Sequence, residues 1–329
     1  MANLRNIKKR ISSVTSIKMI THTMEMVATA RIRRATDRIL EATPYASAMA
    51  NVLRSVARRT KKPKNPLLKT HAEIKKVIVI VVASDRGMAG GFNTTVLRAA
   101  ESFINEMVEK GLDYEIVACG KKTEAYFNFK DLPMGLIIEG RSNHPTIIDA
   151  QRISSYVIDE YTAMSADQVV IFYNHALNVA DQVLRTEQVL PITQLETDLE
   201  ADVDWGKAMS DASARVAAAG TGERYSAAQA VARLSEDEAD PLNYYEYDPS
   251  PAAVLDELLP AYVKTRIYHA LMDSAAGEQG ARRKAMKSAT DSADDMINVL
   301  VRNYNRARQS AITTEIAEIV GGAAVLEDN

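Results

Sequence analysis

The first forty residues carry an apolar repeat that strongly restricts the structures they can adopt. Apolar or small residues recur there at a mean interval of about 3.5, the spacing of a coiled-coil seam. They are Leu4, Ile7, Ile11, Val14, Ile17, Ile20, Met24, Ala28, Ile32, Ala35 and Ile39. Because no Pro or Gly precedes Pro44, we expect one helix of roughly 60 Å at 1.5 Å per residue. Pro44 is expected to kink or end it, although residues 45–59 are again compatible with a helix.

A second long helix is predicted at the other end of the chain. Residues 252–320 contain three residues that disfavour a helix, namely Pro260, Gly277 and Gly280. Gly321 and Gly322 are expected to stop this helix. Because a helix of this length is not stable alone in water, each terminal helix needs a partner along its length. Their matched lengths and small seam residues favour an antiparallel coiled coil over two unrelated helical hairpins.

The pattern changes between residues 71 and 195, where short apolar runs alternate with helical periodicity. Strands are predicted at 76–83, 114–119, 135–138, 168–173 and 183–190. Helices are predicted at 92–110, 121–129 and 146–164. This alternation indicates a doubly wound, mostly parallel sheet. The predicted fold is therefore α plus α/β. Residues 1–65 and 251–329 form an antiparallel coiled-coil shaft, and residues 71–195 form an inserted Rossmann-like domain.

Charge is unevenly placed, although the formal net charge of the 329 residues is only -3. Residues 1–62 hold fourteen Lys and Arg against three acids, whereas residues 196–240 hold eleven acids against four basic residues. The basic segment suggests an anionic partner (nucleic acid, a membrane surface or an acidic protein), and a solvated helix face is the alternative. The acidic, alanine-rich segment is compatible with an exposed helical hairpin, with disorder as the alternative.

No complete catalytic, cofactor or metal motif is present. The loop 84–93 lies where a phosphate-binding loop would follow a strand, but its glycines do not form G-x-G-x-x-G; a tight turn is the alternative. Asp85 with Arg86 is either a catalytic pair or, as we expect, a turn cap or salt bridge. Cys119, the single cysteine, excludes an internal disulfide and is expected in the core. No apolar stretch approaches the ~20 residues that span a bilayer, so we expect a soluble intracellular chain.

Four segments resemble, in order and spacing, the gamma subunit of F-type ATP synthases. They are NIKKRISSVTSIKMITHTMEMVATARIRRA near the start, SDRGMAGGFN after the first strand, EQGARRKAMKSATDSADDMI, and YNRARQSAITTEIAEIVGGAAVL near the end. Family members often have Leu-Cys where this chain has Met88-Ala89. The resemblance covers nearly the whole chain except about 196–240.

This resemblance implies a central-stalk rotor shaft that stands, in one copy per complex, inside a ring of alternating alpha and beta subunits. Flow of protons or sodium ions would turn it and so force the beta subunits through their asymmetric states. The implied partners are alpha, beta, epsilon and the membrane c-ring, without nucleic acid or membrane insertion. The resemblance implies neither a cofactor nor a catalytic site in this chain. It does imply a peripheral location on the cytoplasmic face of the bacterial plasma membrane.

Seven residues match contact positions of that family. Met24 falls on the methionine near an acidic lever of beta. Contacts with a catch loop of beta are implied for Arg282, Gln309 and Thr313. The alternative is seam packing for Met24, and an ordinary polar position on a helix for Gln309 or Thr313. Contacts with the c-ring are implied for Tyr245, Tyr247 and Asp248, and Asp248 stands where the family usually has the longer Glu.

Two other classes of function stay open on the residues alone. A nucleotide-binding α/β enzyme with helical oligomerisation arms would bind nucleotide at residues 87–91. A basic coiled-coil nucleic-acid binder would show salt-sensitive DNA binding.

For the segment 196–240, photosynthetic gamma subunits offer a parallel, because they carry an insertion with two regulatory cysteines near this position. This segment has no cysteine, so we hypothesise instead that it limits reverse rotation or braces the neck against epsilon or beta.

Overall fold

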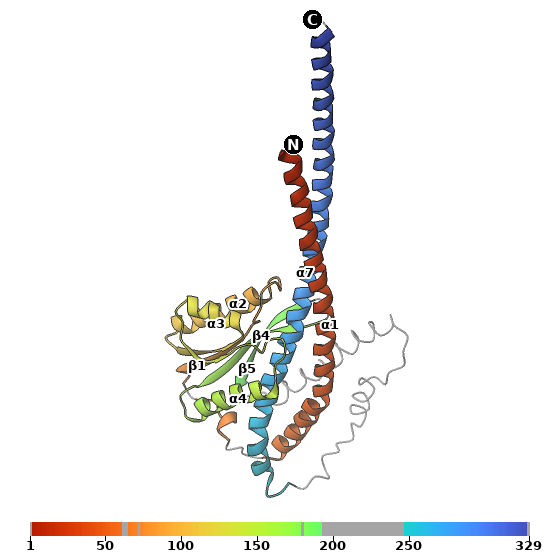
Figure 1. The fold of residues 1–329 in the computed structure, drawn as a ribbon. Helices are drawn as coiled ribbons and strands as arrows, with labels where there is room; N and C mark the ends of the chain where they lie inside the picture. The colour runs from red at the N-terminus through yellow and green to blue at the C-terminus, as the bar shows by residue number, and fades with distance from the viewer. Residues whose placement is uncertain (1, 61–64, 72, 179–180, 193–246, 328–329) are drawn as a thin grey trace, which may run out of the picture. The chain divides into compact units, whose positions relative to one another are not determined.

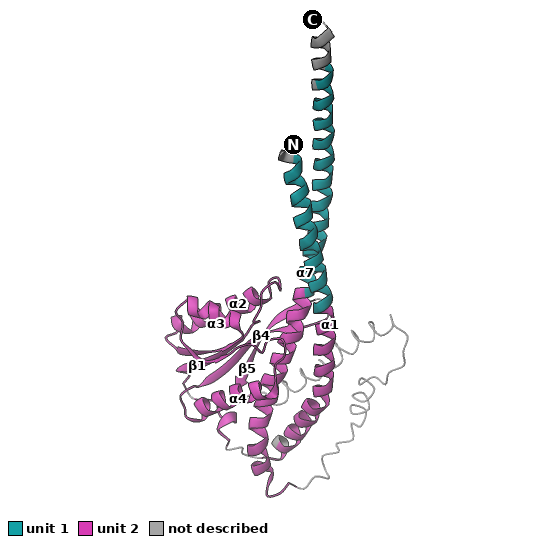
Figure 2. Cartoon of the chain, viewed as in Figure 1, with its two compact units in different colours: residues 1–28, 283–329 teal, residues 29–282 magenta. Residues whose placement is uncertain are grey.

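The computed structural model describes residues 2–60, 65–71, 73–178, 181–192 and 247–327 (Figure 1). The chain divides into two compact units, one of residues 1–28 with 283–329 and one of residues 29–282 (Figure 2). The predicted acidic insertion at 196–240 and the predicted contact residue Tyr245 lie outside the described residues. The limits predicted from the sequence, 1–65 with 251–329 for the shaft and 71–195 for the α/β domain, follow the helices and strands. They remain a prediction.

Both terminal helices are longer than their sequence signals indicate. Helix α1 spans Ala2–Arg59 and includes Pro44, and helix α7 spans Pro251–Glu327 and includes Pro260. The prediction that Gly321 and Gly322 stop the second helix is wrong. A glycine permits a helix end but does not force one, since it costs only about 1 kcal/mol inside a helix. Pro44 is tolerated on an exposed face because the turns on both sides of it bury Ile39 and Leu53.

The unit of residues 1–28 and 283–329 is a pair of antiparallel helices. The Thr290 hydroxyl donates to the Thr21 hydroxyl at 2.8 Å, and Lys18 forms an ion pair with Asp294. Because the lower-numbered residue of α1 meets the higher-numbered residue of α7, the two helices run in opposite directions. The seam is built from small side chains, including the buried Ala293. The predicted antiparallel coiled coil is confirmed.

The unit of residues 29–282 contains a 5-stranded sheet of order β3-β2-β1-β4-β5. The strands are β1 (Lys76–Val82), β2 (Asp113–Cys119), β3 (Met134–Ile138), β4 (Gln168–Ala176) and β5 (Gln182–Leu190). The helices are α2 (Phe92–Glu109), α3 (Lys121–Phe129), α4 (Ile147–Thr162) and a 3-10 turn, η1 (Pro66–Leu68). All neighbouring strands pair in parallel except β4 and β5, which are antiparallel. The mostly parallel sheet is as predicted.

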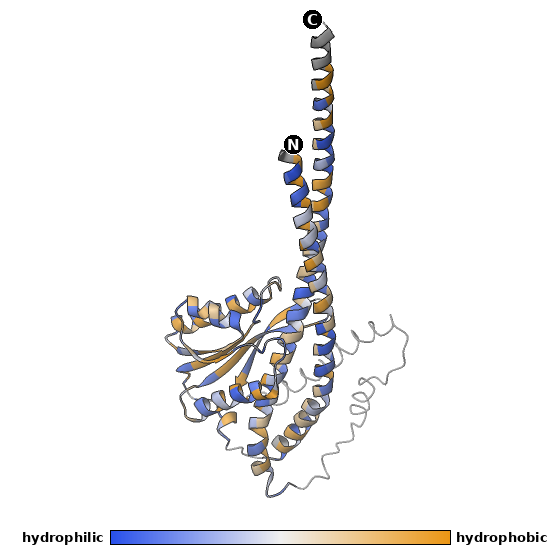
Figure 3. Ribbon diagram, in the orientation of Figure 1, coloured by the Kyte–Doolittle hydropathy of each residue, from blue (hydrophilic) through white to orange (hydrophobic). Residues whose placement is uncertain are grey.

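Two apolar clusters cover opposite faces of the sheet. The strands between them are coloured as apolar in Figure 3. Alternate residues of β1 point to each face, so Val79 packs with residues of α2, whereas Ile80 packs with residues of α4, α1 and α7. A strand buried on both faces reads as a continuous apolar run, which explains KVIVIVV. Helices on both faces make the domain doubly wound.

The order of the strands creates a topological switch point between β1 and β4. The chain moves outward from β1 through β2 to β3 and then returns to the other side of β1 as β4. In doubly wound sheets, ligands bind in the crevice at the carboxyl ends of the strands at such a point. Here that edge is met by residues 271–282 of α7, all of which are buried. This segment therefore lies where the candidate site of the domain is expected.

Candidate functional site

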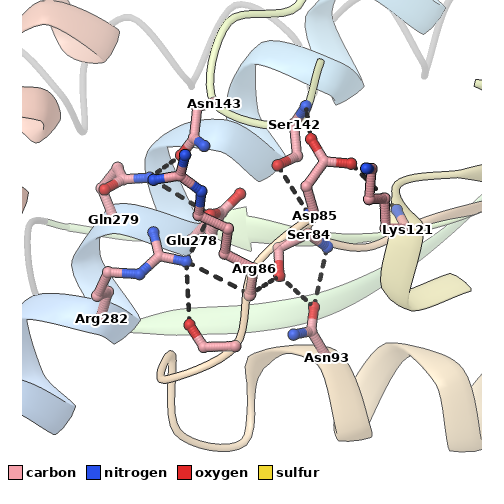
Figure 4. A network of polar contacts seen from close by, with 11 residues as sticks. Ser84, Asp85, Arg86, Asn93, Lys121, Ser142, Asn143, Glu278, Gln279 and Arg282 are labelled. Carbon is pink, nitrogen blue, oxygen red and sulfur yellow. Dashed lines mark hydrogen bonds and ion pairs between the residues drawn. The ribbon is translucent and has the colours of Figure 1, made fainter. Parts of the chain in front are cut away.

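The loop after β1 is tied to the carboxyl edge of the sheet by the side chain of Asp85 (Figure 4). Its carboxylate accepts hydrogen bonds from the backbone N–H groups of Lys121 at 3.0 Å, Gly140 at 2.9 Å and Ser142 at 3.0 Å. Burial raises the pKa of the Asp85 carboxyl, but these hydrogen bonds outweigh burial and hold the pKa below its ordinary value. Asp85 is thus a carboxylate that caps backbone groups, which favours the structural interpretation over the catalytic pair.

The glycines of this loop serve a tight turn from strand to helix. Gly90 has φ 58 and Met88 has φ 62, both in the left-handed region, and Gly91 is the N-cap of α2. Asn93 accepts hydrogen bonds from both the backbone N–H and the hydroxyl of Ser84 at 2.9 Å. Polar groups at the start of the loop are thus satisfied by the side chain of Asn93, and the left-handed residues permit a tight turn.

Helix α7 reaches the same loop through Glu278, Gln279 and Arg282, which Figure 4 shows gathered beside it. Arg282 forms an ion pair with Glu278 at 2.7 Å, and its Nη2 donates to the carbonyl of Gly87 at 3.3 Å. Gln279 donates to the side chain of Asn143 at 2.6 Å. Burial raises the pKa of Glu278, although the Arg282 guanidinium opposes that rise. These polar contacts fasten the helix to the loops that follow β1 and β3.

Two buried polar atoms of this cluster have no hydrogen-bond partner among the described residues. They are Nη1 of Arg282 and Oε1 of Gln279, and the two residues are 5% and 2% exposed. A buried donor without a partner is unfavourable and calls for an explanation. Arg282 was predicted to contact a partner subunit, and such a contact would first have to uncover its buried guanidinium.

The remaining space at the carboxyl edge is small. A cavity of about 20 Å³, enough for one water, is lined by the ends of β1, β2 and β3 and by Leu271 and Ser274 of α7. The thiol of Cys119 lines it as well, and burial raises the pKa of that thiol to about 12. Such a thiol stays protonated and unreactive, so the expectation of a core cysteine is confirmed. In this domain, α7 fills the crevice that a ligand would use.

Three of the predicted beta-contact residues belong to the two-helix unit. Met24 is half-buried, whereas Gln309 and Thr313 are exposed. The Thr313 hydroxyl donates to the Gln309 carbonyl at 2.9 Å, so these two residues share one face of α7. The structure therefore brings Gln309 and Thr313 together on an accessible surface, and Arg282 belongs to the other unit.

The predicted c-ring contacts lie just before α7. The Tyr247 hydroxyl is 2.8 Å from the Ser55 hydroxyl, and the Arg59 guanidinium lies 5.5 Å from the Tyr247 ring centroid. Tyr247 thus attaches the start of α7 to the end of α1. Asp248 is exposed. Its carboxylate is available to a basic partner at this end of the unit.

The sequence analysis missed a buried polar pair between the sheet and α7. His175 Nδ1, at the end of β4, lies 2.5 Å from Asp273 Oδ2 of α7. Asp273 Oδ1 accepts a hydrogen bond from the backbone N–H of Ala176 at 2.9 Å, and Asp273 is 0% exposed. The available signal was one acid within the small and apolar stretch 270–277, but its partner is 98 residues away in the sequence.

The described ranges contain neither a metal site nor a membrane-spanning helix. No group of three or more His, Cys, Asp or Glu residues there is placed to hold a metal ion. Among the helices of those ranges, none is both long and apolar enough to cross a bilayer.

An antiparallel two-helix shaft joined to a doubly wound domain is the fold of ATP synthase central stalks. A chain of the Euglena gracilis mitochondrial ATP synthase, from the OSCP/F1/c-ring structure in rotational state 3, matches with a TM-score of 0.59. The match covers 99% of this chain and 95% of that one, at 16% identity, and so concerns the fold alone.

Sequence comparison gives the family. A family model described as ATP synthase matches residues 3–326. ATP synthase gamma chains are 36% identical in Heliobacterium modesticaldum and 33% identical in Chlorobium phaeobacteroides, and each match covers 99% of this chain and at least 99% of the relative. The chain belongs to the ATP synthase gamma-chain family, which confirms the resemblance found in the sequence.

Proposed function

We propose that this chain is the central-stalk rotor of a proton- or sodium-driven ATP synthase. In this role it transmits torque from the membrane c-ring to the beta subunits and imposes their asymmetric states. Nucleotide chemistry then belongs to beta, and this chain has no catalytic site of its own. Its partners are alpha, beta, epsilon and the c-ring, with one copy per complex. The location is peripheral, on the cytoplasmic face of the bacterial plasma membrane.

The observation that carries this proposal is the continuity of α7. Its 77 residues run without a break from the α/β domain into the two-helix unit, a length of about 115 Å at 1.5 Å per residue. A single hydrogen-bonded helix that belongs to both units can carry a twist applied at one end to the other end. Its pairing with α1 provides the lateral support that a helix of this length needs.

Exposed side chains of the two-helix unit support a partner around it. Toward the end of α7, Ile312, Ile316, Ile319 and Val320 are 48–66% exposed at helical spacing, and Figure 3 shows apolar turns there. An exposed apolar stripe of this kind marks an interaction surface. We propose that beta contacts Met24, Gln309 and Thr313 on this unit and Arg282 on the other, and that the Arg282 contact requires its buried side chain to be uncovered.

The residues just before α7 support the c-ring contact. Asp248 presents an exposed carboxylate beside Tyr247, which is itself held by Ser55 and Arg59. An exposed acid next to this tyrosine suits a basic loop on the c-ring, and we propose that Tyr245, Tyr247 and Asp248 form that contact. Replacement of Asp248 by Lys is then expected to weaken attachment of the c-ring.

The decisive experiment is purification of the tagged chain from its own cells with gentle detergent. Recovery of alpha, beta, epsilon and the c-ring with it, together with loss of ATP synthesis in membranes from cells that lack the chain, is expected. Recovery of the chain alone, or synthesis that persists without it, would contradict the rotor function.

No observation favours the nucleotide-binding enzyme. The crevice that would hold a nucleotide is filled by α7, and backbone carbonyls of the loop at residues 84–91 accept hydrogen bonds from Ser84 and from Arg282 of α7. Titration of the purified chain with ATP or NADH is therefore expected to show no saturable binding at the loop. Tight binding that is lost on replacement of Gly91 by Trp would revive the alternative.

A further inference from the structure

We infer that the crevice at the carboxyl edge of the sheet is a mechanical socket for α7, and that Asp273 and His175 form the latch that keeps the helix from turning in it. The inference rests on the rotor function proposed above. It assigns to these two residues a positioning role in torque transfer between the α/β domain and the helix. A doubly wound domain would thus use the place of a ligand to hold a piece of its own shaft.

The carboxyl edge of the sheet and helix α1 together bury this segment of α7. All residues of α7 from 271 to 282 are buried, which is unusual for a helix with polar and charged side chains. A Cβ added to Gly277 would lie 3.3 Å from the carbonyl oxygen of Asn174 and 3.5 Å from the ring of Phe92. The helix backbone therefore lies directly against the end of β4 and the start of α2, at the switch point of the sheet.

The latch is the directional part of this contact. Both oxygens of the Asp273 carboxylate are used, one by His175 Nδ1 and one by the N–H of Ala176. Both groups belong to the last two residues of β4. Apolar packing resists separation of two surfaces but has little preference for direction, whereas hydrogen bonds weaken steeply when their angles change. Rotation of α7 about its axis must therefore break the contacts of Asp273.

Further polar contacts hold the helix above and below the latch. Gln279 donates to Asn143 and Arg282 donates to the carbonyl of Gly87 toward one end. Toward the other end, Arg266 is paired with Glu187 of β5 at 3.1 Å. The helix is thus attached to the loops after β1 and β3 and to strand β5. Among these attachments, Asp273 is the one with no solvent exposure, so water cannot replace its partners.

The test compares loaded and unloaded rotation in the assembled enzyme. The variants are Asp273→Asn, which keeps the shape but removes the charge, and His175→Gln. The matched control is Glu106→Gln, an exposed carboxylate on α2 paired with Lys110. Hydrolysis of ATP is measured in the detached subcomplex of alpha, beta and this chain, where the α/β domain bears no load. Ion pumping per ATP hydrolysed is measured in membrane vesicles that contain the whole ATP synthase.

The expected result is selective. The latch variants should retain hydrolysis in the subcomplex and lose ion pumping per ATP, while the control retains both. An equal fall in both activities, or unchanged pumping, would overturn the latch. Wild-type vesicles test the rotor function separately, because pumping that does not require this chain would refute the rotor proposal and the latch with it.

A single-molecule measurement covers the case in which Asp273→Asn does not assemble. A bead attached through Lys110→Cys reports the angle of the α/β domain while the shaft is held in the subcomplex. His175→Gln is expected to broaden the angular fluctuations of the bead relative to the Lys110→Cys parent, in which His175 and Asp273 are unchanged. An angular spread equal to that of the parent overturns the latch.

Discussion

Removal of the Asp85 carboxylate should loosen three loops at once. In Asp85→Ala, the N–H groups of Lys121, Gly140 and Ser142 lose their acceptor. A hydrogen bond contributes about 1 kcal/mol net, and one to a charged group up to about 3 kcal/mol when well buried. Because Asp85 is only partly buried, the lower value applies, and the three bonds together should cost about 3 kcal/mol.

The loss is measurable both globally and locally. A cost of 3 kcal/mol corresponds to roughly 6–12 °C in the melting temperature of a domain of this size. Hydrogen exchange at the three N–H groups should accelerate more than at the strand centres. The control is Asp113→Ala, an exposed acid at the start of β2, for which we expect a change within about 0.5 kcal/mol. Equal melting temperatures for the two variants would refute the role of the Asp85 carboxylate.

The same effect should depend on pH with a definite sign. The pKa of Asp85 is lower in the folded chain than its unfolded value of about 3.9. Its contribution to stability is therefore fully present above that value and is lost as the pH falls through the folded pKa. The difference in unfolding free energy between wild type and Asp85→Asn should thus be constant from pH 7 to 5 and shrink below about pH 3.9. A difference that grows on acidification would contradict the assignment.

Three more predictions concern backbone geometry, the shaft surface and the insertion. Gly120→Ala should destabilise the α/β domain by more than about 2 kcal/mol in urea unfolding. The reason is that Gly120 has φ +95 and that a Cβ there would lie 2.2 Å from the carbonyl oxygen of Ala83. The control is Gly87→Ala, whose added Cβ would have no atom within 4 Å. Gln309→Ala with Thr313→Ala should lower ATP synthesis without a change in melting temperature, since both side chains are exposed; unaltered synthesis would contradict the beta contact. Deletion of residues 198–238 should alter ATP hydrolysis or its inhibition, and unchanged values of both would remove the regulatory role of the insertion.

Much of the fold follows from periodicities that are visible along the chain. The 3.5-residue repeat from Leu4 to Ile39 lies within one helix, and the run KVIVIVV is the central strand. These features were predictable because the apolar pattern of an element depends on its own geometry. The end of α7 was not predictable, because Gly321 and Gly322 permit a helix end but do not force one. The helix continues to Glu327.

Some features of the candidate site were likewise predictable from the sequence, and others were not. Turn chemistry indicated that Asp85 caps a loop, and resemblance indicated Gln309 and Thr313, which share a helix face by simple i, i+4 spacing. The open donor of Arg282 and its pair with Glu278 required the folded loop beside them. Burial and partners are properties of the packed molecule, and sequence spacing alone does not reveal them.

The sequence by itself determined that the chain has two long terminal helices with an α/β domain between them, because local periodicity and the absence of helix breakers act within each segment. Only the tertiary structure decided that α7 fills the crevice at the switch point and that Asp273 meets His175 there. These contacts join residues about a hundred positions apart. They depend on where the strands of the sheet end in space, which is set by packing of the whole domain.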